Sequence, residues 1–295
     1  ASNCRPFGAR VSLEGADLGE SRARADHIAA DENLTFLHPF DDDRVIAGQG
    51  TIALEILEQV PTADAIVVPV GGGGLLAGIA TVVRAKKAGV TLIGVEPEHA
   101  NSLALSRQAG KPVAAKLSPT LADGLAVPQV GVRPLAVLRD AIDDVVTVDE
   151  ASIALAILRL IELEKSVVEG AGATPLAALL AGKLDRLKDR EVVLVLCGGN
   201  IDLTMLDRVI EVGLVADGRL CRFAVSITDR PGGLARLAQV IASTGASVKE
   251  IVHDRAFAGP DLSAVRVVCV VESTGHAHVR ELHGALAAAG IEVVG

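Results

Sequence analysis

The stretch Val-Pro-Val-Gly-Gly-Gly-Gly-Leu-Leu-Ala-Gly, residues 68–78, decides the fold. In it an apolar run ends, four glycines follow, and an apolar helical pattern begins. The run at 65–70 predicts a buried strand, and the pattern at 75–88 predicts a helix. Because glycine has no Cβ, the backbone N–H groups at 71–74 can approach an oxyanion, and a helix N-terminus adds positive dipole. The stretch therefore predicts a phosphate site at a strand end.

A tight turn with no ligand is the alternative interpretation of these glycines, since glycine also permits sharp connections. A nucleotide is disfavoured. The chain has no Gly-x-Gly-x-x-Gly followed by an acid, and no Gly-Lys-Ser/Thr follows the loop.

Strand and helix patterns alternate from Val11 to about Asn200, which indicates βαβ units around a mainly parallel sheet and hence an α/β fold. The expected strands are 11–13, 35–37, 65–70, 92–95, 145–148 and 192–196. The expected helices are 20–30, 50–59, 75–88, 134–141, 150–163 and 175–187. The runs 65–70 and 192–196 are apolar on both faces, so we expect both strands at the centre of the sheet.

A second unit follows residue 216. Residues 203–216 have a helical or mixed pattern, Asp217-Gly218 is a turn signal, and a new strand pattern then begins. The order is strand 222–227, helix 231–243, strands 247–254 and 263–271, helix 276–289 and strand 291–294. This is a ferredoxin-like βαββαβ arrangement. We therefore expect domains at 1–216 and 217–295.

Composition excludes several classes of protein. The net charge of −9 and pI of about 5.3, without an extended basic segment, argue against a nucleic-acid partner. No apolar stretch approaches the ~20 residues that span a bilayer, and no signal peptide opens the chain, so we expect a cytoplasmic protein without a membrane partner. The scattered cysteines Cys4, Cys197, Cys221 and Cys269 fit reduced thiols better than disulfides or a zinc site.

The sequence Leu-Cys-Gly-Gly-Asn at 196–200 also follows a predicted strand, at the sheet edge where open α/β folds bind ligands. Cys197 can form a weak hydrogen bond to a ligand nitrogen. The alternative is a small buried thiol, and taken alone this alternative is favoured.

Five ordered motifs together resemble the threonine/serine dehydratases, which are fold-type II pyridoxal-phosphate enzymes with serine racemase as a close cousin. The resemblance runs from about Gly8 to Asp202. The motifs are Asp-Arg-Val-Ile-Ala-Gly-Gln-Gly-Thr-Ile-Ala-Leu-Glu-Ile at 43–56, the glycine loop at 71–74, Thr-Leu-Ala-Asp-Gly at 120–124, Val-Glu-Gly-Ala-Gly-Ala at 168–173 and Cys-Gly-Gly-Asn-Ile-Asp at 197–202.

The resemblance implies a site for pyridoxal phosphate. The glycines would hold the phosphate, and Cys197 would face the pyridine nitrogen, where the family has Ser or Cys. A neutral partner there leaves the nitrogen largely unprotonated and favours elimination. Glu169 would lie near the ring side of the pocket; capping the glycine segment that follows it is the alternative. The implied cofactor residues are Gly71, Gly72, Gly73, Gly74, Leu75, Glu169, Cys197 and Gly198.

The family resemblance also implies a divalent cation beside the site. Glu96 and the Ala100 carbonyl match two of its ligands, but Ser102 stands where a second carboxylate is expected. The alternative for Glu96 is a solvated acid at a strand end.

Two family motifs are not found in the 295 residues. These are Ser-Phe-Lys-x-Arg-Gly-Ala, with the Schiff-base lysine, and Ser-x-Gly-Asn-His-x-x-Gly, which binds the substrate carboxylate. We expect both in a segment before Ala1, so that the fold-type II body is N-terminally incomplete and the chain alone is inactive.

The second unit resembles the ACT domains attached to threonine dehydratases, through Phe223 to Gly233 and Glu250 to Arg255. Such domains bind amino-acid effectors, here implied at Gly232 and Gly233. A plain dimerisation module is the alternative, and the family suggests a homo-oligomer, dimer or tetramer. We expect His276 and His278 to be surface residues at a helix start.

The favoured function is that of a threonine ammonia-lyase, catabolic or in isoleucine biosynthesis, which converts threonine to 2-oxobutanoate or serine to pyruvate. One alternative is a serine dehydratase or serine racemase, which usually lacks an ACT tail. The other is a non-catalytic amino-acid-sensing protein. The missing lysine supports this second alternative, but it leaves the retained glycine loop and Cys-Gly-Gly-Asn without a purpose.

Overall fold

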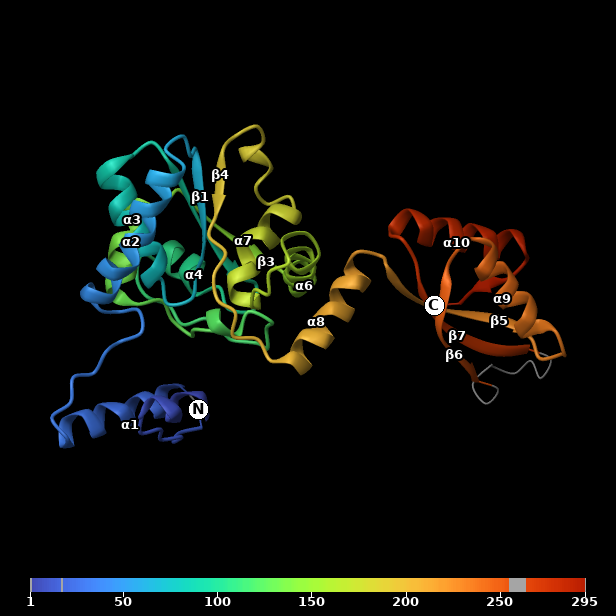
Figure 1. Cartoon of the computed structure of the whole chain (residues 1–295), viewed down its shortest axis with the longest axis horizontal. Helices are drawn as coiled ribbons and strands as arrows, with labels where there is room; N and C mark the ends of the chain where they lie inside the picture. Colours follow the sequence, from blue (N-terminus) through green and yellow to red (C-terminus); the bar gives the residue numbers. More distant parts are fainter. Residues whose placement is uncertain (1, 17, 255–263, 295) are drawn as a thin grey trace.

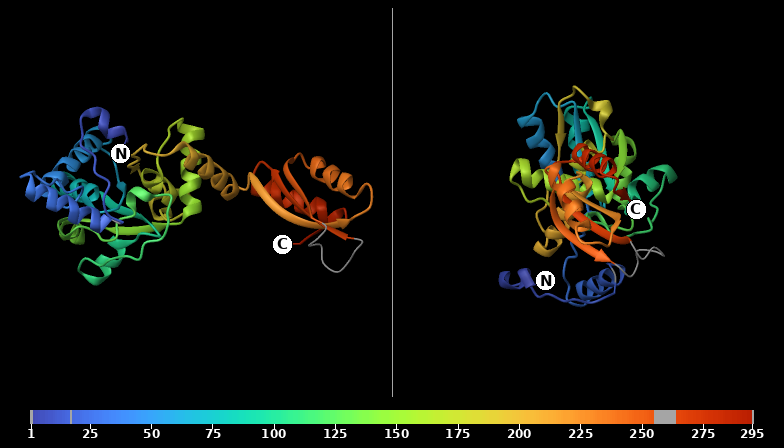
Figure 2. Two further views of the ribbon diagram at one scale, coloured as in Figure 1. Left: turned by 90° about the horizontal axis from the view of Figure 1, so that it is seen from below. Right: turned by 90° about the vertical axis from the view of Figure 1, so that its right-hand side faces the viewer.

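A computed structural model describes residues 2–16, 18–254 and 264–294 of the chain. They form a unit around a parallel sheet and a unit around an antiparallel sheet, which the long helix α8 (Leu203–Ala216) connects (Figure 1). The left view of Figure 2 shows the antiparallel unit beyond the far end of α8. No described helix is long and apolar enough to cross a membrane.

The first sheet has four parallel strands in the order β3-β2-β1-β4. The strands are β1 (Ala65–Pro69), β2 (Thr91–Pro97), β3 (Asp144–Val148) and β4 (Val192–Leu194). Every residue of β1 is buried, which confirms the prediction of a strand covered on both faces. The central position predicted for β4 is wrong: within the described residues β4 is an edge strand, because nothing there pairs with its outer side.

Helices cover both faces of this sheet, each with its own apolar core. The helices are α2 (Asp43–Gln59), α3 (Gly74–Lys86), α4 (Ser102–Ala109), α5 (Val132–Ala141), α6 (Glu150–Arg159) and α7 (Gly170–Leu180), with the short helical turns η2 (Asp123–Leu125), η3 (Leu160–Glu164) and η4 (Asp185–Leu187). Helix α2 begins seven residues before the predicted start, since the Asp42 side chain accepts the N–H of Arg44 and caps it. Helix α7 also begins earlier than predicted, and α4 was not predicted.

Helices α2 and α3 cross at a point where each has a glycine, and this close crossing brings the start of α3 near the turn before α2. A Cβ on Gly78 would overlap the carbonyl of Ile46 and lie 2.6 Å from the nitrogen of Gly50. A Cβ on Gly50 would lie 3.1 Å from the carbonyl oxygen of Gly78. The two helices therefore touch backbone to backbone, which a larger residue at either position would prevent.

The N-terminal segment contains η1 (Ser2–Phe7) and α1 (Leu18–Asp31), and in Figure 1 it lies beside the parallel-sheet unit. Helix α1 confirms the prediction for 20–30. The strands predicted at 11–13 and 35–37 are wrong, because both segments lack regular secondary structure and pair with no strand among the described residues. Their apolar side chains also lack a cover: Leu13 is 78% and Leu37 is 68% exposed.

The C-terminal unit confirms the predicted βαββαβ order. Its antiparallel sheet has the order β6-β7-β5-β8, and one apolar core lies under α9 and α10. The elements are β5 (Leu220–Thr228), α9 (Gly233–Ser243), β6 (Ser247–Asp254), β7 (Ala264–Glu272), α10 (His276–Ala288) and β8 (Glu292–Val293). Helix α9 begins two residues later than predicted, after Gly232 in a left-handed conformation. Ser263 of the predicted strand and Arg255 of the ACT-like motif lie outside the described residues.

Candidate functional site

The four glycines link the end of β1 to the start of α3, as the sequence predicted. Gly73 is the N-cap of α3 and has a φ of 88°, a left-handed conformation that favours glycine. Hydrogen bonds hold the loop on both sides: the N–H of Gly131 donates to the Gly72 carbonyl at 3.1 Å, and the N–H of Ala77 donates to the Gly73 carbonyl at 2.9 Å. The loop therefore has one defined shape next to a helix N-terminus.

The protein around this loop leaves no space for side chains. A Cβ on Gly72 would overlap the ring of Phe40, one on Gly73 would lie 2.9 Å from Cβ of Pro134, and one on Gly74 would lie 2.9 Å from the Phe40 carbonyl oxygen. Bare backbone is thus required along the loop. This arrangement fits the phosphate of a cofactor, which can reach N–H groups only where no Cβ intervenes.

The loop forms one wall of a pocket of about 340 Å³, which we call the glycine-loop pocket. Seven of the eight predicted cofactor residues line this pocket, together with residues that were not predicted. The lining residues are Pro39, Phe40, Gln49, Pro69, Gly71, Gly72, Gly73, Gly74, Leu75, Gly124, Leu125, Val127, Glu169, Ala171 and Cys197. Gly198 does not line the pocket, but it lies directly behind Glu169, where an added Cβ would overlap the carboxylate.

Glu169 holds the loop after β4. It stands at the N-cap of α7, but its side chain makes no capping hydrogen bond to that helix. Instead Oε2 accepts the N–H of Asn200 at 3.0 Å, and the backbone N–H of Glu169 donates to the Gly198 carbonyl at 3.0 Å. The carboxylate thus positions the Cys-Gly-Gly-Asn segment rather than the glycines that follow it in sequence.

Cys197 is an exposed residue that lines the pocket, and the surrounding protein partly buries its thiol. This partial burial, and secondly the Glu169 carboxylate, raise the pKa of the thiol. The group is therefore neutral at physiological pH, the state that the family resemblance requires opposite a pyridine nitrogen.

The turn before α2 supplies one wall of the pocket, although no functional role was predicted for its residues. Phe40 contacts the glycine loop, and the neighbouring polar side chains fix its backbone. His38 Nδ1 accepts the N–H groups of Phe40 at 3.2 Å and Asp41 at 2.8 Å. Asp41 in turn accepts the N–H of Arg133 at the start of α5, at 2.9 Å. The available signal was an aromatic residue just before the Asp cap of a helix, in a chain with only five Phe and no Tyr or Trp.

Glu96 is fully buried, so its interpretation as a solvated acid is wrong. Its Oε1 accepts the N–H of Leu103 at 2.7 Å and its Oε2 that of Ala104 at 2.9 Å, at the start of α4. Burial raises the pKa of the carboxyl to about 7. Ala100 and Ser102 are buried nearby, and the described residues contain no group of three His, Cys, Asp or Glu side chains that suits a metal. The cation stays a prediction.

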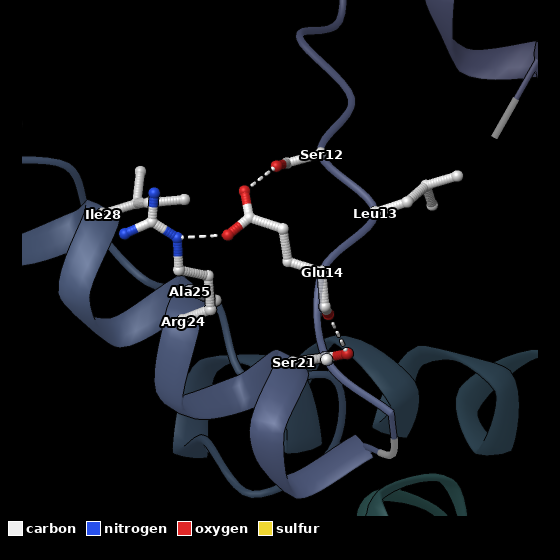
Figure 3. A pocket seen from close by; sticks show the side chains of 8 residues that line it. Ser12, Leu13, Glu14, Ser21, Arg24, Ala25 and Ile28 are labelled. Carbon is white, nitrogen blue, oxygen red and sulfur yellow. Dashed lines mark hydrogen bonds and ion pairs between the residues drawn. The ribbon is translucent and has the colours of Figure 1, made fainter.

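Two further pockets lie away from these residues. In the N-terminal segment (Figure 3), the Glu14 carboxylate accepts the Ser12 hydroxyl at 2.5 Å and pairs with Arg24 at 2.6 Å, so the polar groups there satisfy one another. In the C-terminal unit, Gly233 lines a cavity of about 390 Å³ with Thr228 and Arg236, whereas Gly232 does not.

His276 and His278 stand at the start of α10, as predicted. Both make hydrogen bonds to backbone carbonyls: Nε2 of His276 lies 3.0 Å from the Ala216 oxygen and Nε2 of His278 lies 2.8 Å from the Thr244 oxygen. The first of these bonds connects α10 to the end of α8.

Comparison with known proteins agrees with this geometry. Residues 1–198 match the model of the pyridoxal-phosphate dependent enzymes, and the chain belongs to this family. More particularly, it is 45% identical to an L-threonine ammonia-lyase of Geobacter sulfurreducens over 278 residues, which cover 94% of this chain and 69% of that protein. It is 40% identical to the L-threonine ammonia-lyase of Thermotoga maritima over 289 residues, 98% of this chain and 72% of that protein.

Solved structures show the same fold. The processed form of threonine deaminase isoform 2 from Solanum lycopersicum matches with a TM-score of 0.68 and 35% identity, over 72% of this chain and 62% of that chain. Maize serine racemase matches with a TM-score of 0.66 and 32% identity, over 72% of this chain and 66% of that chain. The described chain thus spans about two thirds of each of these proteins.

Proposed function

We propose that this chain carries the cofactor-binding body of a threonine ammonia-lyase, which converts L-threonine to 2-oxobutanoate and ammonia by β-elimination. The observation that carries the proposal is the glycine loop, whose backbone lines the same pocket as Cys197 and Glu169. Similarity to two bacterial L-threonine ammonia-lyases supports threonine as the substrate.

In this proposal residues 1–216 form the catalytic body and residues 217–295 an ACT regulatory domain. When bound, pyridoxal phosphate supplies the electron sink for the elimination. The N–H groups of the glycine loop and the α3 dipole hold its phosphate. Cys197 presents a neutral thiol to the ring, and Glu169 keeps the Cys197 segment in position through Asn200.

In this proposal, none of the lysines in the 295 residues forms the covalent bond to the cofactor. No lysine lines the glycine-loop pocket, and none stands in a Ser-Phe-Lys motif. The chain alone is therefore expected to bind the cofactor without turning threonine over. The eight lysines are Lys86, Lys87, Lys111, Lys116, Lys165, Lys183, Lys188 and Lys249.

The test has two steps. Pyridoxal phosphate is titrated into the purified chain and its absorbance and fluorescence are followed, with inorganic phosphate as competitor. Saturable binding that phosphate displaces is expected, and no binding would overturn the proposal. The chain, and any longer product of its gene, are then assayed for 2-oxobutanoate from threonine and pyruvate from serine. Preference for serine would favour a serine dehydratase, and release of 2-oxobutanoate by the 295-residue chain would overturn the proposal on lysine.

An amino-acid effector is proposed at the C-terminal cavity, with Gly233, Thr228 and Arg236 in its lining and Gly232 at its helix N-cap. Amino-acid binding there with no cofactor binding elsewhere would support the non-catalytic sensing alternative. A cytoplasmic homo-oligomer belongs to the same proposal, as does a divalent cation at Glu96 and Ala100. The N–H groups of Leu103 and Ala104 each donate to one oxygen of the Glu96 carboxylate, so a cation would share these oxygens with them.

A further inference from the structure

The ring of Phe40 lies flat against the glycine loop. Three of its ring carbons, Cγ, Cδ1 and Cδ2, would overlap a Cβ built on Gly72, and its backbone crosses just outside Gly74. Phe40 thus covers one side of the loop and forms a side wall of the glycine-loop pocket.

The surrounding turn holds this ring in place. The ring centroids of His38 and Phe40 lie 4.6 Å apart, edge to face, while His38 Nδ1 accepts the Phe40 N–H. Burial, and secondly the charge of Arg22, lower the pKa of His38, which keeps Nδ1 free to accept at neutral pH. Asp41 ties the next residue to the first turn of α5. Moving Phe40 away from the loop would break these bonds.

On the other side of Phe40 lies a second, apolar cavity of about 560 Å³, which we call the Phe36 groove. Helix α1 forms its outer wall, where the guanidinium of Arg22 lies 3.8 Å from the centroid of the Phe36 ring. Three residues border both the groove and the glycine-loop pocket: Pro39, Phe40 and Val127. Phe40 has the largest side chain of the three, so it is the main partition between the two spaces.

We propose that Phe40 is a specificity-determining residue, which keeps the amino-acid side chain accepted beside the cofactor short. This inference rests on the proposed function. The glycine-loop pocket, at about 340 Å³, is near the lower end of ligand sites, so a cofactor and a small β-hydroxy amino acid fill it. A larger apolar side chain would need the space of the Phe36 groove, and Phe40 blocks the way.

Reduced cofactor adducts test this without an enzyme lysine. Phosphopyridoxyl-L-threonine and phosphopyridoxyl-L-leucine are stable secondary amines, and calorimetry gives the Kd of each. The wild-type chain is expected to bind the threonine adduct at least about tenfold more tightly than the leucine adduct. This is the discrimination that a pocket achieves between side chains that differ by a methylene group. In Phe40→Ala the Kd of the leucine adduct should exceed that of the threonine adduct by less than about threefold, because the leucine adduct gains affinity.

Phe36→Ala is the matched control, since Phe36 lines the groove but not the glycine-loop pocket, and its ratio should equal that of the wild type. Phe40→Leu provides a smaller change if Phe40→Ala does not fold. An unchanged ratio in the folded Phe40 variant, or equal binding of both adducts by the wild type, overturns this inference alone. Failure of the wild type to bind either adduct or pyridoxal phosphate overturns the proposed function together with it.

Discussion

The chain uses the same local device twice, with different surroundings. Helices α3 and α9 both follow a strand and a glycine turn, and both have a left-handed glycine at the N-cap: Gly73 with a φ of 88° and Gly232 with a φ of 97°. A Cβ on Gly73 would press on Pro134, whereas one on Gly232 would have nothing within 4 Å. Backbone conformation alone therefore does not distinguish a buried ligand loop from an open turn.

Tertiary packing makes the difference. The first turn is enclosed by Phe40, Glu169 and Cys197, which come from three other segments of the chain. The second turn borders a more polar cavity, which residues at the end of β5 and the start of β7 line together with Arg236. In the first turn glycine is needed both for its left-handed conformation and because a side chain would not fit. Gly232 is needed for its conformation only. Substitutions at these equivalent positions should therefore have unequal effects.

The largest effect is expected for Gly72→Ala. The added methyl group would overlap the Phe40 ring, so the variant must displace either the ring or the loop. We expect a loss of about 3 kcal/mol or more in the free energy of unfolding, as overpacking produces, and pyridoxal phosphate binding about 100-fold weaker. Urea unfolding and cofactor titration measure the two. A Kd for pyridoxal phosphate within about threefold of the wild-type value would contradict this prediction. It would show that the loop accepts a side chain, as an open turn does.

The parallel-sheet unit should also be the more sensitive to pH, because it contains Glu96, whose pKa burial raises from 4.5 to about 7. The folded state then holds the proton more tightly than the unfolded state. This stabilisation is fully present below pH 4.5 and is lost as the pH rises through about 7. The free energy of unfolding should thus fall by about 2 kcal/mol between pH 5 and pH 7 from this residue.

Glu96→Gln removes the titration and supplies the control for this pH dependence. Urea unfolding at several pH values should show a smaller slope in the variant than in the wild type over this range. Parallel slopes would mean that the hydrogen bonds from Leu103 and Ala104 stabilise the carboxylate as much as burial destabilises it.

The difference in stability between Gly73→Ala and Gly232→Ala is expected to be smaller than the effects above. Both variants place alanine in a left-handed conformation, which costs about 1–2 kcal/mol. Gly73→Ala adds the contact with Pro134, so we expect it to lose about 1 kcal/mol more and to weaken cofactor binding about tenfold. Gly232→Ala should leave cofactor binding unchanged. Equal losses of stability in the two variants would mean that Pro134 moves aside without cost.

Elements defined by local pattern were predictable from the sequence. The strand before Gly71, the turn itself and the βαββαβ order all depend on periodicity and glycine placement within a short window. The first turn of α7 did not follow from pattern, because its glycines and alanines have no helical periodicity. They are helical because Gly170 packs on the carbonyl of Leu121 and Gly172 on that of Cys197, where any side chain would overlap.

The errors share a cause. The strands predicted at 11–13 and 35–37 needed partners that the described residues do not provide. The α4 helix depends on the carboxylate of Glu96, which accepts its first N–H groups from another element. Phe40 was missed for the same reason: its contact with Gly72 exists only after α2 and α3 have packed. Residues on one strand end could be predicted as a site, but the wall that encloses them could not.

The smallest expected effect compares the cysteines of the two units. Cys197 has a thiol pKa raised by burial and by the charge of Glu169, whereas burial alone raises the pKa of Cys221. Glu169→Gln should therefore lower the pKa of Cys197 and speed its alkylation by iodoacetamide about two- to fivefold at pH 8. Cys221 should react at the wild-type rate, as its surroundings lie in the other unit. Peptide mass spectrometry follows each thiol separately. An unchanged rate at Cys197 would mean that Glu169 acts on its neighbours through the Asn200 hydrogen bond and not through its charge.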